Sequence, residues 1–78
     1  MKYIDALKLI NLCLEEKILH EKEKHVCVYK GASNTHPEGW YLVDKYMLAH
    51  ELMCDEKGQN ILMSKLKEKE IDFVPTKF

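Results

Sequence analysis

Two pairs of histidine and cysteine residues have spacings that could bring metal ligands together. His25 and Cys27 are two positions apart in a segment rich in β-branched residues, and His50 and Cys54 are four positions apart in a segment with helical spacing. Residues at i and i+2 share one face of a strand, and residues at i and i+4 share one face of a helix. Imidazole nitrogens and thiolates are the ligands of structural zinc sites. A small zinc-binding domain is therefore one hypothesis for this chain.

A hairpin followed by a helix also resembles the ββα zinc fingers, which take two ligands from the hairpin and two from the helix. Here the hairpin pair is a mixed His-x-Cys instead of two spaced cysteines, and the loop between the strands is longer than in that family. We favour the simpler interpretation, in which Cys27 and Cys54 are small core side chains and His25 and His50 lie near the surface. The chain is expected to need no metal and no other cofactor.

The cysteines do not predict a catalytic nucleophile. Cys13, Cys27 and Cys54 are each surrounded by apolar residues, whereas a reactive thiol needs an exposed, electropositive setting. No glycine-rich phosphate loop is present either. Because three cysteines cannot all pair within one chain, we interpret them as reduced thiols of a cytoplasmic protein. We therefore expect that the protein is not an enzyme.

Composition indicates a folded chain of ordinary character. Of the 78 residues, 46% are hydrophobic and 32% are charged, which is too apolar for a disordered chain. A chain of this length has room for one domain, which we assign to residues 1–78. Residues 71–78 are predicted to form either a short third strand or a flexible tail.

The charge pattern argues against a nucleic-acid partner. Twelve lysines and thirteen acidic residues leave a net charge of −1, the two signs are mixed along the chain, and arginine is absent. Nucleic-acid binders concentrate positive charge on one surface, and arginine is the residue that reads guanine in bidentate fashion. The all-lysine usage suggests an AT-rich coding sequence, from a low-GC bacterium or its phage.

We expect neither a signal peptide nor a membrane span. The first five residues include Asp5 and contain no apolar core or cleavage site. The longest uninterrupted apolar run has four residues, whereas a membrane span needs about 20.

Hydrophobic periodicity predicts the elements that would position these residues. An amphipathic helix is expected over about residues 2–20, followed by the solvated charge run 21–24. Strands are expected over about 25–30 and 40–43, because both segments are rich in β-branched and aromatic residues. Asp44 is expected to cap a helix over about 45–54. Residues 55–59 are expected to form a corner before a last helix that runs to about residue 70.

These elements predict a small α+β domain in the order α-β-β-α-α. Both strands are apolar on both faces, so we expect a two-stranded antiparallel hairpin packed between helices. The alternative leaves one face or edge of the hairpin for a second chain, by dimerisation or strand addition. The predicted core consists of Leu7, Ile10, Leu14, Val28, Leu42, Leu48, Leu52, Ile61 and Leu66.

The loop at residues 31–39 is the predicted functional surface. Loops beside rigid strands often carry binding residues, and Trp40, the single tryptophan, directly follows this one. The alternative is an inert loop with Trp40 buried as ordinary core. The candidate partner-binding residues are Tyr29, Asn34, His36, Glu38, Trp40 and Tyr41.

We conclude that the sequence predicts a non-enzymatic domain that binds another protein, or a second copy of itself, as an accessory or inhibitory factor. One alternative is a DNA-binding dimer, because a strand and two helices over residues 40–70 resemble ribbon-helix-helix repressors in element order. Those proteins read the major groove with polar side chains of a paired strand, whereas residues 40–43 are apolar.

Overall fold

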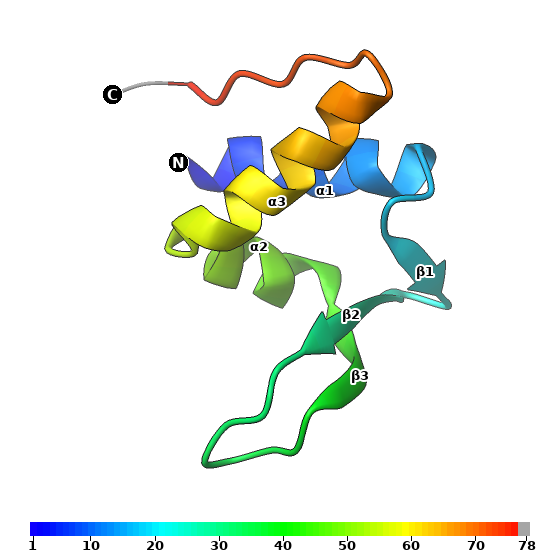
Figure 1. Cartoon of the computed structure of the whole chain (residues 1–78), viewed down its shortest axis with the longest axis vertical. Helices are drawn as coiled ribbons and strands as arrows, with labels where there is room; N and C mark the ends of the chain where they lie inside the picture. Colours follow the sequence, from blue (N-terminus) through cyan, green and yellow to red (C-terminus); the bar gives the residue numbers. More distant parts are fainter. Residues whose placement is uncertain (77–78) are drawn as a thin grey trace.

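Three helices and a three-stranded antiparallel sheet make up the computed structural model, which describes residues 1–76 (Figure 1). The elements follow the order α1 (Tyr3–Glu15), β1 (His20–Lys22), β2 (His25–Lys30), β3 (Gly39–Asp44), α2 (Lys45–Met53) and α3 (Glu56–Glu68). The predicted small α+β class is confirmed, whereas the predicted order lacked β1. The helices gather at one end of the molecule, and the β2–β3 hairpin extends away from them (Figure 1).

The helices enclose a core built around α1. The buried apolar side chains of this helix recur at intervals of three, one and three residues, which places them on one stripe; they are Ala6, Leu9, Ile10 and Cys13. Facing this stripe, Ala49 and Leu52 of α2 and Leu66 of α3 are buried as well. The small side chain of Ala49 allows α1 and α2 to approach closely.

Both long helices end earlier than the sequence predicts, α1 by about five residues and α3 by about two, and both end in the same way. Lys17 and Glu70 have φ angles of 60° and 63°, in the left-handed region that stops a helix. The amide of Ile18 donates to the carbonyl of Cys13 at 2.8 Å, and the amide of Ile71 donates to the carbonyl of Leu66 at 3.0 Å. Each pattern is a Schellman motif closed by a residue other than glycine.

An aspartate caps the N-terminus of each of the other two helices, Asp44 for α2 and Asp55 for α3. The carboxylate of Asp44 accepts hydrogen bonds from the amides of Tyr46 and Met47, as predicted. The carboxylate of Asp55 accepts from the amide of Gly58 at 2.9 Å. Residues 56–59 therefore form the first turn of α3 and not the predicted corner between helices.

The sheet contains one strand that the sequence did not predict. β1 pairs with the first half of β2, with His20 opposite Cys27 and Lys22 opposite His25. Glu23, at a φ of 59°, occupies the tight turn between the two strands. The charge run at residues 21–24 is thus part of a hairpin instead of a solvated break.

The β2–β3 hairpin buries one face only. On the inner face, Val26 is opposite Val43 and Val28 is opposite Tyr41, and these valines pack against the helical core. Lys30 extends this contact through a 3.9 Å salt bridge to Glu51 of α2. The other face of the hairpin, which we call the outer face, is largely exposed. The prediction of a hairpin enclosed between helices is therefore wrong.

Two predicted core residues consequently lie at the surface. Leu42, on the outer face, is 50% exposed, and Ile61, on the side of α3 that no described element covers, is 48% exposed. The other seven predicted core residues are buried or half-buried.

The C-terminal segment crosses back over α1 (Figure 1). The buried carboxylate of Asp5 accepts hydrogen bonds from the Thr76 amide at 2.9 Å and from the Thr76 hydroxyl at 3.1 Å. Ile71 and Phe73 pack against the core on the way. Residues 71–76 form no strand, contrary to one of the two predictions for 71–78; positions 77 and 78 lie outside the described residues.

Candidate functional site

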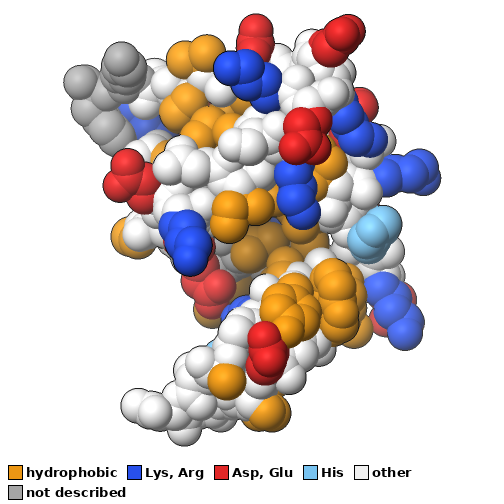
Figure 2. All heavy atoms as spheres, in the orientation of Figure 1, with side chains coloured by type: hydrophobic (Ala, Val, Ile, Leu, Met, Phe, Trp, Pro, Cys, Tyr) orange, Lys and Arg blue, Asp and Glu red, His pale blue; other side chains and the backbone are white. Residues whose placement is uncertain are grey.

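A pair of exposed aromatic rings dominates the outer face. Tyr29 of β2 and Trp40 of β3 are direct cross-strand partners, with ring centroids 5.4 Å apart and ring planes at 71°. Trp40 is 67% exposed and Tyr29 is 54% exposed. The predicted alternative of a buried Trp40 is therefore wrong. With Leu42 beside them, these rings form an apolar surface on the outer face. Figure 2 shows hydrophobic side chains gathered over the hairpin.

An apolar groove separates this hairpin from α3. It has a volume of about 340 Å³, and its walls include Cys27, Tyr29 and Trp40 on the hairpin and Ile61, Leu62 and Lys65 on α3. Figure 2 shows the hollow between the hairpin and the helical end of the molecule, with hydrophobic side chains on both sides. The groove is open to solvent.

An unpaired strand edge accompanies the groove. β1 pairs with β2 only as far as Cys27, so within the described chain Val28, Tyr29 and Lys30 have a neighbouring strand on the β3 side alone. An edge of this kind presents backbone amides and carbonyls that can pair with another chain. Val28 and Tyr29 also line the groove, which places this edge at its wall.

The predicted site residues divide between the two sides of the hairpin. Tyr41 points to the inner side, where its ring meets that of His36 at 5.2 Å and its hydroxyl donates to the Pro37 carbonyl at 2.6 Å. Glu38 lies on the Tyr29 side, and its hydrogen bond raises the pKa of the Tyr29 phenol. Trp40 and Tyr41 therefore face different surroundings, although they are adjacent in sequence.

The loop itself is ordered by its own polar groups. The Ser33 hydroxyl accepts from the amides of Thr35 and His36, and the Ser33 amide donates to the His36 carbonyl at 2.9 Å. Asn34 lies exposed at this turn. These contacts hold the loop in one shape, which reduces the entropy that binding would cost.

The four candidate zinc ligands do not meet. His25 and Cys27 share the outer face of β2, as the spacing predicts, but the His50 ring packs on Tyr3 with centroids 4.6 Å apart. Cys54 is exposed at the end of α2, so the prediction that it is a core side chain is wrong. Across residues 1–76, no three His, Cys, Asp or Glu side chains are grouped so that they could hold a metal ion.

The thiol of Cys13 is poorly suited to nucleophilic chemistry. It lies in the core, and burial raises its pKa from 9.0 to about 11, although the positive charge of Lys65 opposes the change. A nucleophilic cysteine needs the reverse, an accessible thiol with a lowered pKa.

Sequence reasoning missed the α3 side of the groove, and it gave an open face or edge of the hairpin only as the alternative to an enclosed one. Ile61 matches the apolar period of a core residue, and nothing in the sequence indicates that its side of α3 is uncovered. The open edge depends on the length of β1, whose residues His20, Glu21 and Lys22 have low strand propensity. Neither feature had a signal in local composition.

Comparisons with protein families, with curated proteins and with solved structures find no match to this chain. Among the described residues, no helix has the length and apolar character that crossing a membrane requires.

Proposed function

We propose that this chain is a non-enzymatic cytoplasmic domain that binds another protein by receiving an extended segment of it in the groove between the hairpin and α3. One observation carries this proposal: an unpaired strand edge at Val28–Lys30 borders an apolar groove that has two exposed aromatic rings on its wall. The domain then acts as an accessory or inhibitory factor for its partner.

The two parts of this surface would contribute differently to binding. A segment that lies beside β2 continues the sheet where β1 ends, and its backbone hydrogen bonds supply affinity without regard to sequence. Alternate side chains of that segment point into the groove, where Trp40 and Tyr29 provide rigid apolar area. The partner segment therefore has large apolar residues at every second position.

The loop at residues 31–39 would contribute to partner binding only on the outer face of the hairpin. Glu38, which bonds to the Tyr29 hydroxyl, stands next to the aromatic pair and can accept a hydrogen bond from the partner. His36 and Tyr41 are held against each other on the inner side, so their role is to fix the shape of the loop.

No observation favours the other two hypotheses. The order β3-α2-α3 matches that of ribbon-helix-helix repressors, but β3 pairs with β2 of its own chain and presents Trp40 and Leu42 outward instead of polar side chains. The zinc hypothesis lacks a cluster of ligands among residues 1–76.

Affinity capture from the source cell, followed by titration of the captured partner, tests the proposal. Trp40→Ala should raise the dissociation constant at least tenfold, which corresponds to about 1.4 kcal/mol, because it removes the largest apolar anchor. Tyr46→Ala is the matched control, since Tyr46 is a similarly exposed aromatic on α2 that does not line the groove. Equal affinity of the wild type and the Trp40 variant would disprove the assignment.

A second experiment locates the partner through the thiol of Cys27, which lies in the groove wall. In a Cys54→Ser background, Cys27 is the more accessible of the two remaining cysteines, because Cys13 is fully buried. Bound partner should slow alkylation of Cys27, and prior attachment of a bulky maleimide should block binding. An alkylation rate that saturating partner leaves unchanged would place the contact elsewhere.

A further inference from the structure

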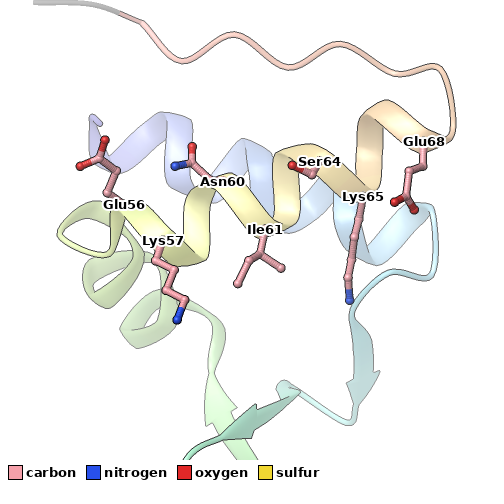
Figure 3. Close-up of a pocket in the computed structure, with 7 residues that line it drawn as sticks. All are labelled: Glu56, Lys57, Asn60, Ile61, Ser64, Lys65 and Glu68. Atoms are coloured by element: carbon pink, nitrogen blue, oxygen red, sulfur yellow. The ribbon is translucent and has the colours of Figure 1, made fainter.

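The exposed face of α3 carries charges in an unusual order. Lys57, Ile61, Ser64 and Glu68 are spaced at i, i+4, i+7 and i+11, which places them in one row along the helix. Figure 3 shows them on the same open side of α3, with Lys57 near its first turn and Glu68 at its end. The row lies in a shallow depression of about 740 Å³, to which Glu56, Asn60 and Lys65 also contribute.

The two end charges are unfavourable for the isolated helix. The first turn of a helix favours negative side chains and the last turn favours positive ones, because the peptide dipoles align along the axis. Lys57 and Glu68 have the opposite arrangement, whereas Glu56 in the first turn and Lys65 and Lys67 in the last turn suit the dipole. Within residues 1–76, neither side chain forms a salt bridge that would compensate.

We propose that this face pairs with the same face of a second copy of the chain, the two α3 helices running antiparallel about a two-fold axis. Reversing the row places Lys57 opposite Glu68 of the second copy and Ile61 opposite Ser64 of the second copy. The two-fold axis repeats both contacts, so the row is complementary to itself, as an interface between identical copies requires. Two salt bridges form, and each pairs two charges that the dipoles of their own helices disfavour.

The packing of side chains on this face also favours a second copy of the chain as the partner. Ile61 is 48% exposed and is the one large apolar side chain among the residues that line this depression. Ser64 is small, so the isoleucine of one copy can approach the helix axis of the other closely. Ile61 and Lys65 also line the groove beside the hairpin, so the depression adjoins that groove without including Trp40.

The length of the helix sets the strength of the dimer. The 13 residues of α3 span about 20 Å, so a pair of such faces buries less than the roughly 800 Å² per partner of a standard interface. We therefore expect a weak dimer, in monomer–dimer equilibrium between about 10 μM and about 1 mM protein.

Charge reversal tests the pairing by sedimentation equilibrium on the full chain. Lys57→Glu places two acids opposite each other, and Glu68→Lys places two lysines opposite each other, so each variant alone should dimerise at least tenfold more weakly than the wild type. An equimolar mixture of the two variants brings opposite charges together at both ends. It should form a heterodimer with an affinity close to that of the wild type.

Two controls make the result specific. Lys67→Glu makes the same charge change on α3 outside this row and should leave the dissociation constant within twofold of the wild type. Trp40→Ala should also leave it unchanged, because Trp40 lies outside the row; loss of partner binding and loss of dimerisation are thus separate outcomes. Circular dichroism should show the charge variants fully folded, since both reversals suit the helix dipole. A wild type that stays monomeric up to about 1 mM, or a mixture no tighter than its components, would overturn the proposal.

Discussion

The hydrogen bonds between Asp5 and Thr76 give a measurable contribution to stability. Asp5 is only 3% exposed, and its two carboxylate oxygens accept from the amide and the hydroxyl of Thr76. Thr76→Val removes the hydroxyl while keeping the backbone bond and the shape of the side chain. A hydrogen bond to a charged group contributes about 1.5–3 kcal/mol, and the low end applies because Thr76 itself is exposed. We expect a loss of about 1–1.5 kcal/mol in the free energy of unfolding.

Thermal and urea unfolding followed by far-ultraviolet circular dichroism measure this loss. In a domain of this size, 1 kcal/mol shifts the midpoint by about 4–8 °C, so Tm should fall by about 4–12 °C. Thr35→Val is the matched control: the Thr35 hydroxyl bonds only to the neutral hydroxyl of Ser33 in an exposed loop, and its removal should change stability by less than about 0.5 kcal/mol.

A double-mutant cycle with Asp5→Asn separates the contact from other effects of each substitution. If the carboxylate and the hydroxyl stabilise each other, the two changes together should cost less than their sum, by about 0.5 kcal/mol or more. A loss below about 0.3 kcal/mol for Thr76→Val, or strict additivity in the cycle, would show that the C-terminal segment is not held by this contact.

Three further predictions follow from burial and backbone geometry. Leu66→Ala should cost about 2–5 kcal/mol in urea unfolding, whereas Leu42→Ala should cost less than about 1 kcal/mol, because only the first side chain is enclosed; equal costs would contradict the assignment of an exposed outer face. Lys17→Gly should stabilise the domain by about 0.5–1 kcal/mol and raise its Tm, because glycine adopts the φ of 60° without strain. A lower Tm would refute this. Burial raises the pKa of the Cys13 thiol from 9.0 to about 11, so the native state holds this proton more tightly than the unfolded state. The stability that results is complete below pH 9 and is lost as the pH rises from 9 to about 11. Urea titrations across that range should show a smaller decline for Cys13→Ala than for the wild type, and parallel declines would argue against the shift.

Local signals were sufficient to predict most elements of this fold. β2 was predicted at its observed bounds because β-branched residues lie between a charge run and Gly31, and Asp44 marked the start of α2. The ends of α1 and α3 were missed because Lys17 and Glu70 occupy left-handed positions that usually hold glycine. β1 was missed because its three residues are polar and its pairing with β2 is a tertiary contact.

The candidate site was predictable only in part. Its aromatic residues, Tyr29 and Trp40, could be identified because large rings beside a loop are rare in so short a chain. Which face of the hairpin is covered could not be predicted, because residues 40–43 are apolar at every position and give no period-two signal. The role of Ile61 likewise depends on where α3 packs, which no residue within that helix specifies.

The position of Trp40 determines what the intrinsic fluorescence of this protein reports. It is the single tryptophan of the chain, and its ring is 67% exposed in the folded state. Unfolding therefore moves the indole from one aqueous environment to another, and the emission maximum should hardly change as the core melts. A ligand that enters the groove, in contrast, removes water from the ring and should shift its emission to shorter wavelength. The emission maximum of Trp40 should therefore report binding in the groove and respond very little to unfolding.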